Sequence, residues 1–201
     1  MKEKTPFKPI DLTLAALFVA MTAIGANITT IAPFMQIGSV PITLQTFFAI
    51  LAGLVLGKRL GSIAMLVYLL VGLVGVPAFA GLTGGFVAIT KPTFGFILSF
   101  IPAAYVAGLI VENRKNITFY MLAALIGTAL NYIIGTTWMY FAFLFWAGAP
   151  EGFTYIIAWS WMTPFMPKDI ILAIFAGVFA TRLQASVLSR SRFQRHSPAG
   201  Q

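Results

Sequence analysis

The sequence contains no cysteine and one histidine, His196, which lies in the polar C-terminal tail. Without cysteine, disulfide bonds and thiolate metal sites are excluded. Without a histidine in the apolar part of the chain, there is no candidate for a Ser–His nucleophile or a histidine-ligated metal. The chain also has no G-x-x-x-x-G-K-[ST] phosphate loop and no dinucleotide fingerprint. We therefore expect neither an enzyme nor a protein that hydrolyses ATP itself.

Charge is scarce too. Only 9% of the 201 residues are charged, whereas soluble domains carry about 25% charged residues. Hydrophobic residues make up 59% of the chain, and their runs lack the alternation of barrel strands. A helix needs about 20 residues to cross the hydrocarbon layer, which leaves room for roughly five to seven spans. The composition predicts an all-α integral membrane protein without a separate soluble domain.

The apolar runs predict six transmembrane helices in one bundle, forming a single domain over residues 1–201. The first run follows a basic segment but has no clean small-x-small cleavage site, so it is interpreted as a helix and not as a cleaved signal. A disordered basic tail is expected over 186–201. The expected helices span residues 11–30, 44–57, 61–75, 92–111, 117–147 and 165–181.

The cations predict the orientation of this bundle. Six helices place both termini on one side, together with all of the 13 lysines and arginines except Lys91 and Lys168. Short basic loops stay in the cytoplasm, so both termini are expected there. The net charge of +8 thus reports topology in a cytoplasmic membrane, with lipid as the surroundings, and does not indicate a nucleic-acid partner.

Ionisable residues within or beside the spans are the first candidates for a binding site. Asp169 lies about 20 Å of helix before Arg182, which places it inside the hydrocarbon layer if Arg182 marks the inner surface, and in the interface if Arg182 lies below that surface. Such groups face a cavity or a partner, and Pro164 and Pro167 interrupt the helix just before it. An outward-facing pocket is expected between the loops 36–46, 77–91 and 150–169.

Structural roles remain open for the same residues. Asp169 also suits the first turn of a helix, where the dipole favours an acid. Lys168 and Lys91 also suit the membrane interface. Asn131 lies on a stripe of small residues, where an interhelical hydrogen bond and a ligand contact are both possible roles.

Four segments resemble the BioY family, the biotin-specific substrate-binding subunits (S-components) of energy-coupling factor transporters. The resemblance extends over nearly the whole chain and implies the six-helix S-component fold with cytoplasmic termini. It also implies docking to a transmembrane coupling subunit and two ATPase subunits, for which Ala16 and Ala20 match an AxxxA face of the first helix. The segments are VPITLQTFFAILAGLVLG (40–57), GLVGVPAFAGLTGGF (72–86), KPTFGFILSF (91–100) and PFMPKDIILA (164–173).

The resemblance also implies a biotin pocket near the outer face. Asp169 matches the acidic residue at the start of the family's sixth helix and would accept hydrogen bonds from the ureido N–H groups of biotin. Lys91 would meet the carboxylate. The ureido carbonyl would contact Gln45 and Asn131. The remaining expected contacts are with Phe79, Thr83, Phe86, Tyr132 and Trp138.

One departure from the family pattern concerns the lysine partner. Many members have a lysine about one turn after the aspartate, but here Ile170 to Ala173 follow it and Lys168 precedes it. Adjacent residues of a helix do not share a face. Either Lys168 substitutes from the preceding loop, or Lys91 alone meets the carboxylate.

The expected function is binding of biotin for high-affinity uptake across the cytoplasmic membrane, energised by partner ATPases through the coupling subunit. Biotin is the transported ligand, and no cofactor is expected. Two alternatives remain. One is an S-component for a different vitamin, and the other is a membrane assembly or scaffold protein that binds no solute.

Overall fold

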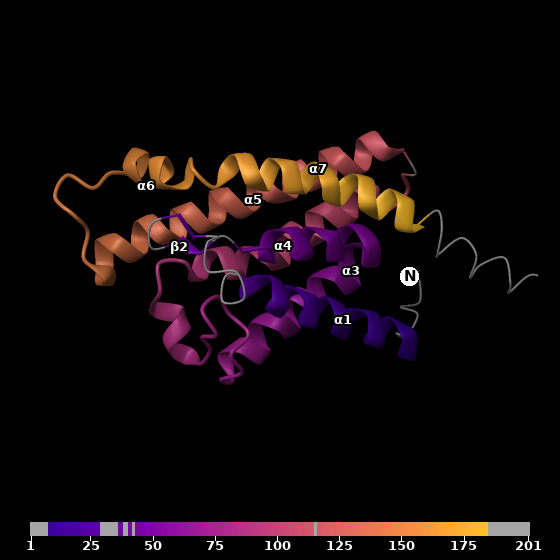
Figure 1. Ribbon diagram of the computed structural model, residues 1–201, viewed down its shortest axis with the longest axis horizontal. Coiled ribbons are helices and arrows are strands. Elements are labelled where there is room, and N and C mark those ends of the chain that lie inside the picture. The colour runs from indigo at the N-terminus through magenta and orange to yellow at the C-terminus, as the bar shows by residue number, and fades with distance from the viewer. Residues whose placement is uncertain (1–7, 29–35, 38–39, 42, 115, 185–201) are drawn as a thin grey trace, which may run out of the picture.

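The computed structural model describes residues 8–28, 36–37, 40–41, 43–114 and 116–184, which form a helical bundle (Figure 1). The expected tail 186–201 and the end of the first expected helix, residues 29–30, lie outside these ranges. A two-stranded antiparallel ladder joins β1 (Gln36–Ile37) to β2 (Val40–Pro41). The helices are α1 (Pro9–Ala26), α3 (Gln45–Leu73), α4 (Phe94–Val111), α5 (Ile117–Ala142), α6 (Tyr155–Met162) and α7 (Met166–Leu183).

The helix α3 is a tight helical hairpin. Gly57, near its middle, has φ 82° and ψ 171°, which lie outside the helical region. A β carbon on Gly61 would lie within van der Waals overlap of Gly53, and the side chain of Gln45 donates a hydrogen bond to the Tyr68 hydroxyl at 2.7 Å. Residues so far apart in sequence meet only if the helix reverses its direction at Gly57.

Glycine makes this reversal possible, because a positive φ crowds the β carbon of other residues. The two arms of α3, residues 45–56 and 58–73, occupy the ranges in which the sequence predicts two separate short helices. The sequence predicts a connection at residues 58–60. The observed connection is shorter, because the second arm begins directly after Gly57.

A second break separates α6 from α7, which meet at 60°. Pro164 lies in the break, and a proline removes a backbone donor and disfavours a continuous helix. Thr154 caps the start of α6 by accepting a hydrogen bond from the backbone N–H of Ile157. The sequence analysis assigned this segment to a loop, so α6 is an element that it did not predict.

Four helices of the described chain are long and apolar enough to cross a membrane, namely α1, α3, α4 and α5 with its π-helical extension Phe143–Ala147. The bent pair α6 and α7 provides a fifth candidate. Because α3 is a hairpin, it supplies two helices instead of one. The all-α membrane bundle of six helices that the sequence predicts is confirmed.

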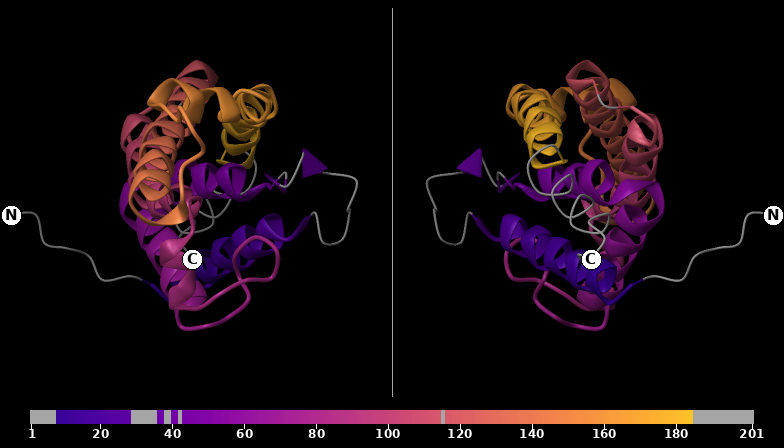
Figure 2. Two further views of the ribbon diagram at one scale, coloured as in Figure 1. Left: turned by 90° about the vertical axis from the view of Figure 1, so that its left-hand side faces the viewer. Right: turned by 90° about the vertical axis from the view of Figure 1, so that its right-hand side faces the viewer.

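Small residues allow these helices to pack closely. Gly53 of α3 lies against the backbone of Ala104 in α4, and Gly177 of α7 lies against the backbone of Met121 in α5. Figure 2 shows α3 in the middle of the bundle, with α1 on one side and α7 on the other. Such small contact residues are typical of helix packing in membranes.

Polar contacts tie the helices together at the end of the bundle where α1 begins and α7 ends (Figure 1). Lys58 of α3 pairs with Glu112 after α4 at 2.6 Å. Gln184, which follows α7, accepts a hydrogen bond from the Tyr120 hydroxyl at 2.7 Å and donates one to the carbonyl of Leu54 at 3.1 Å. The opposite end of the bundle is left for the loops and for a cavity.

Candidate ligand-binding site

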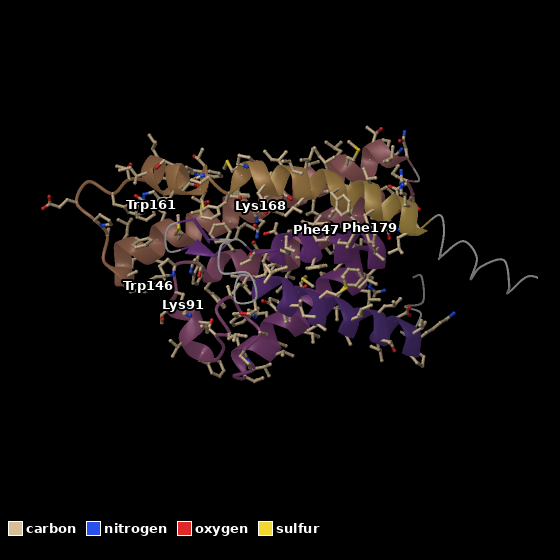
Figure 3. All side chains as sticks on the ribbon, viewed as in Figure 1. Phe47, Lys91, Trp146, Trp161, Lys168 and Phe179 are labelled. Atoms are coloured by element: carbon tan, nitrogen blue, oxygen red, sulfur yellow. The ribbon has the colours of Figure 1, made fainter. Side chains whose placement is uncertain are left out.

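A cavity of about 780 Å³ lies between α3, α4, α5, α6 and α7, and volumes of roughly 300–1,000 Å³ are typical of small-molecule sites. Lys91 and Trp161 lie toward the end of the bundle away from the chain termini, and Lys168 lies deeper (Figure 3). The walls of the cavity are formed by Thr43, Gln45, Thr46, Phe79, Ala80, Thr83, Ala88, Lys91, Pro92, Thr93, Phe94, Phe96, Ile97, Phe100, Asn131, Tyr132, Met139, Phe143, Ser160, Trp161, Met162, Pro164, Phe165, Lys168 and Asp169.

Asp169 is a buried carboxylate on the wall of this cavity, with 8% of its surface exposed. It lies in the first turn of α7, at the end where the helix dipole favours negative charge. One carboxylate oxygen, Oδ1, lies 2.7 Å from the ammonium of Lys168. The other, Oδ2, accepts a hydrogen bond from the Tyr132 hydroxyl at 2.7 Å. These contacts fix both oxygens at the cavity surface.

Lys168 is the ion-pair partner of Asp169, which corrects the expectation that these neighbours could not share a face. Lys168 belongs to the first turn of α7 and not to the preceding loop. Its ammonium contacts Asp169 and also donates to the carbonyl of Thr43 at 2.8 Å. Because the lysine stem is long and flexible, the ammonium can reach the carboxylate of the adjacent Asp169. The same ammonium joins α7 to the residues just before α3.

Lys91 is the second cation of the cavity. Among the described residues, no hydrogen bond or ion pair involves its ammonium, and its side chain is partly exposed. Its backbone is held from α5 and the π-helix, because the indole of Trp138 donates to the Lys91 carbonyl at 3.4 Å and that of Trp146 to the Thr90 carbonyl at 2.6 Å. The segment that carries Lys91 is therefore fixed, while its charge is available.

The charges of the described lining residues leave a net positive charge in the cavity. Asp169 and Lys168 compensate each other, whereas Lys91 remains without a carboxylate partner. The cavity therefore suits a solute with one anionic group near Lys91 and a neutral group that can donate hydrogen bonds to Asp169.

Gln45 and Asn131 line the same cavity but are already engaged within the protein. Gln45 donates to the Tyr68 hydroxyl at 2.7 Å, which in turn donates to the carbonyl of Ala78 at 2.9 Å. Asn131 donates to the Ser99 hydroxyl at 2.6 Å and to the Phe96 carbonyl at 3.0 Å. The interhelical role foreseen for Asn131 is thus present.

The amide oxygen of Asn131 has more freedom than its nitrogen. Its one described contact is with the hydroxyl of Thr46, at 3.4 Å. That distance is long for an O–H···O hydrogen bond. Asn131 therefore offers an acceptor to a solute, whereas its N–H groups are occupied by α4.

Aromatic rings provide most of the apolar wall. Phe79 and Tyr132, both expected in the site, line the cavity together with Thr83. Phe86 does not line it, because it lies in a 3₁₀ helix (Phe86–Thr90) with 71% of its surface exposed. We therefore remove Phe86 from the site. Trp138 is also absent from the lining, and its role is to hold the segment of Lys91.

Several lining residues were not named by the sequence analysis, and seven of them lie on two elements, α4 and α6. Ser160, Trp161 and Met162 lie on α6, which was expected to be a loop. Phe96 and Phe100 lie on α4 one turn apart and face the cavity. The threonine cap at the start of α6 was the available signal, since a threonine directly before an apolar run favours a helix start.

The expected docking residues are not part of the cavity lining. Ala16 and Ala20 are four residues apart on α1, and both are exposed in the bundle. The apolar residues Leu12, Leu17 and Ile24 beside them are exposed as well. This side of α1 is an apolar surface available to lipid or to another helix.

The fold and the cavity define a helical membrane protein with a candidate site for a small solute between its helices. No cluster of metal-binding side chains occurs in the described ranges. The chain belongs to the BioY family, whose model matches residues 1–189, and it is a multi-pass protein of the cytoplasmic membrane. The resemblance found in its sequence segments is confirmed.

Individual relatives cover nearly the full chain. The putative biotin transporter BioYB of Bacillus subtilis (strain 168) is 42% identical over 92% of this chain and 93% of that protein. The probable biotin transporter BioY of Pyrococcus horikoshii is 40% identical over 89% of this chain and 99% of that protein. The fold is similar to the 2.1 Å crystal structure of the S-component for biotin from an ECF-type ABC transporter, with a TM-score of 0.75 and 23% identity over 90% of this chain and 96% of that chain.

Proposed function

We propose that this chain binds biotin and serves as the S-component of an energy-coupling factor transporter. It captures biotin at the outer face of the cytoplasmic membrane and depends on partner ATPases for uptake. It acts as a transport component and not as an enzyme. The names of its relatives and the chemistry of its cavity both support this proposal, whereas nothing specific favours a different vitamin or a scaffold without a ligand.

The observation that carries the proposal is the buried Asp169 carboxylate, held between Lys168 and Tyr132 at the cavity surface. A carboxylate has about four lone-pair positions, so it can accept further hydrogen bonds while keeping these two partners. The ureido ring of biotin has two N–H donors, one on each side of its carbonyl group. Asp169 can accept from one of them, and a hydrogen bond to a charged group contributes about 1.5–3 kcal/mol.

The opposite end of the ligand is assigned by charge. Biotin carries one carboxylate at the end of its valerate chain, and Lys91 is the uncompensated cation among the described lining residues. With the ureido ring at Asp169, the valerate extends toward Lys91, and the rings of Phe79 and Phe96 cover the apolar body. Gln45 and the amide oxygen of Asn131, which can accept a further hydrogen bond, also line the cavity.

The orientation in the membrane follows from the basic residues. In the described part of the chain, Lys8, Lys58, Arg59 and Arg114 lie at helix ends or connections on the terminal side of the bundle. Basic connections stay in the cytoplasm, so we infer that both termini are cytoplasmic and that the cavity belongs to the outer half. A coupling subunit with two ATPases would then dock on the side of α1 that carries Ala16 and Ala20.

Calorimetric titration of the purified chain with a panel of vitamins tests this proposal. Biotin is expected to bind with a submicromolar dissociation constant, and thiamine and riboflavin are expected not to bind. Desthiobiotin, which keeps the ureido ring and the carboxylate but lacks the thioether, should bind more weakly than biotin but measurably. Binding of another vitamin in place of biotin, or of no vitamin by folded protein, would overturn the proposal.

A further inference from the structure

The turn Phe79–Thr83 forms part of the cavity wall and contains an unusual backbone conformation. Its ends are joined by reciprocal hydrogen bonds, Phe79 N to Thr83 O at 2.9 Å and Thr83 N to Phe79 O at 3.2 Å. At its tip Gly81 and Leu82 have φ angles of 72° and 54°, and Leu82 is the one non-glycine residue with positive φ among the described residues. Because this region crowds the β carbon of leucine, a contact that fixes the tip favours the turn.

Asn27, at the end of α1, makes that contact. Its Oδ1 accepts a hydrogen bond from the backbone N–H of Leu82 at 2.6 Å, and its Nδ2 donates to the carbonyl of Ala23 at 3.0 Å. The amide is buried, with 8% of the residue surface exposed. Since a backbone N–H only donates, the amide oxygen must face Leu82. Asn27 therefore joins the last turn of α1 to the tip of the turn.

The base of the same turn is held by a different helix. The Tyr68 hydroxyl of α3 donates to the carbonyl of Ala78 at 2.9 Å, and the Phe79 ring packs edge-on against Tyr68 with centroids 5.7 Å apart. Gly72 leaves the space that this ring occupies. The base is thus fixed by α3 and the tip by α1, although no described residue of α1 lines the cavity itself.

We propose that Asn27 is a positioning residue for the bound ligand. Through Leu82 it holds the turn so that Phe79 and Thr83 close against the solute, and it links the position of α1 to the shape of the cavity. A change in the position of the end of α1 therefore changes the affinity for the ligand, and ligand binding opposes that change to the same extent. For its affinity measurement, this inference rests on the proposed binding of biotin.

Biotin association and dissociation rates test the inference in four proteins: the unmodified chain, Asn27→Ala, Leu82→Gly and the double variant. Losing the hydrogen bond should raise the dissociation rate about threefold to tenfold and leave the association rate within about twofold. Glycine adopts a positive φ without crowding, so Asn27→Ala should have less than about a twofold effect when residue 82 is glycine. Thr13→Ala, which also removes a side-chain hydrogen bond on α1, is the matched control and should change neither rate.

Hydrogen–deuterium exchange supplies a readout that does not require biotin. The amide of Leu82 should exchange more slowly in the unmodified chain than in Asn27→Ala, with unchanged exchange in the middle of α1. Equal dissociation rates for the unmodified chain and Asn27→Ala would overturn the inference, as would an equal effect of Asn27→Ala in both backgrounds. If the unmodified chain does not bind biotin, the proposed function fails, and hydrogen exchange at Leu82 alone decides the inference. An exchange rate of the Leu82 amide that is the same in the unmodified chain and in Asn27→Ala would then overturn it.

Discussion

At the residue scale, Asp169 is a charge in an apolar bundle, and its neighbours explain how it remains there. A lone buried charge in a membrane costs several kcal/mol, and here an ion pair with Lys168 and a hydrogen bond from Tyr132 offset that cost. Both contacts lie at the cavity wall, so the same carboxylate can accept hydrogen bonds from a solute. If the chain binds biotin as proposed, structural stability and ligand recognition both depend on this one side chain.

Replacing Asp169 with asparagine tests this role. The amide side chain would keep a carbonyl acceptor but lose the charge that strengthens the hydrogen bond from the ureido N–H group. We expect the dissociation constant for biotin, measured by titration calorimetry, to rise about 10- to 100-fold, because each charge-assisted hydrogen bond contributes about 1.5–3 kcal/mol. The control Asp11→Asn removes a partly exposed acid of α1 and should leave the dissociation constant unchanged. An affinity of Asp169→Asn within twofold of the unmodified chain would contradict the assignment.

The assignment of Lys91 predicts a selective loss. Lys91→Met should weaken biotin about fivefold, because a partly exposed ion pair contributes about 1 kcal/mol, but should not weaken biotin methyl ester, which lacks the carboxylate. Competition against labelled biotin at two salt concentrations measures both affinities, and the salt effect seen for biotin should shrink in the variant. Lys8→Met, at the other end of the bundle, is the control. Equal losses for acid and ester would remove Lys91 from carboxylate recognition.

Residue chemistry in the sequence was sufficient to find the ionisable groups of the cavity, but not their contacts. Asp169 and Lys91 stand out because charges are rare in the apolar part of this chain. The ion pair of Lys168 with Asp169 was not foreseen. Helix geometry gives the direction in which a side chain leaves the backbone, but it does not give the position of the ammonium at the end of a long, flexible side chain. Phe86 was assigned by proximity to a glycine-rich loop, and only the backbone path of that loop reveals that its ring faces outward.

At the element scale, the hairpin of α3 brings Gln45 and Tyr68 together and so builds one side of the cavity. The reversal depends on the positive φ of Gly57, around which no neighbouring atom limits the space for a β carbon. Glycine is therefore needed at this position for its backbone conformation and not because other residues of the bundle lie close to it.

Gly57→Ala and Gly57→Asn separate these two demands. Alanine should lower the free energy of unfolding by about 1–2 kcal/mol, because positive φ is unfavourable for an L residue. Asparagine should cost about as much despite its larger size, because its tolerance of positive φ is confined to ψ near about +47° and does not extend to the ψ of 171° found here. Unfolding in mixed micelles measures both variants. A larger loss for asparagine than for alanine would mean that space, and not backbone conformation, limits this turn.

The ranges of the long helices could be predicted because their apolar runs end at charges, glycines or prolines. The short helix α6 was missed although Thr154 marks its start, since its eight residues lie in a segment rich in tryptophan and proline that resembles an interfacial loop. Its helical state depends on packing: Ala158 and Met162 are buried against Tyr132 and Met139 of α5. Such tertiary contacts are not visible in local sequence.

At the scale of the whole molecule, α1 and the cavity occupy different parts of the bundle. The exposed side of α1 carries Ala16 and Ala20, whereas the cavity is lined from α3 to α7. If a coupling subunit docks on α1, ligand binding and energised uptake should be separable by mutation.

Ala16→Trp is expected to separate them. A bulky side chain prevents close helix approach, so ATP-driven biotin uptake by cells that contain the partner subunits should be lost. Biotin binding by the purified variant should stay within twofold of the unmodified chain. The control Ile171→Trp alters a residue of α7 that is 67% exposed, on the opposite side of the bundle, and should retain uptake. Normal uptake by Ala16→Trp would exclude this side of α1 as the docking surface.

The position of biotin in an experimental structure of its complex with this chain tests the central claim most directly. The account predicts one ureido nitrogen within hydrogen-bond distance of the Asp169 carboxylate and the valerate carboxylate directed toward the Lys91 ammonium, with the Lys168–Asp169 and Tyr132–Asp169 contacts retained. A biotin molecule bound outside this cavity, or one turned so that its carboxylate lies near Asp169, would contradict the account.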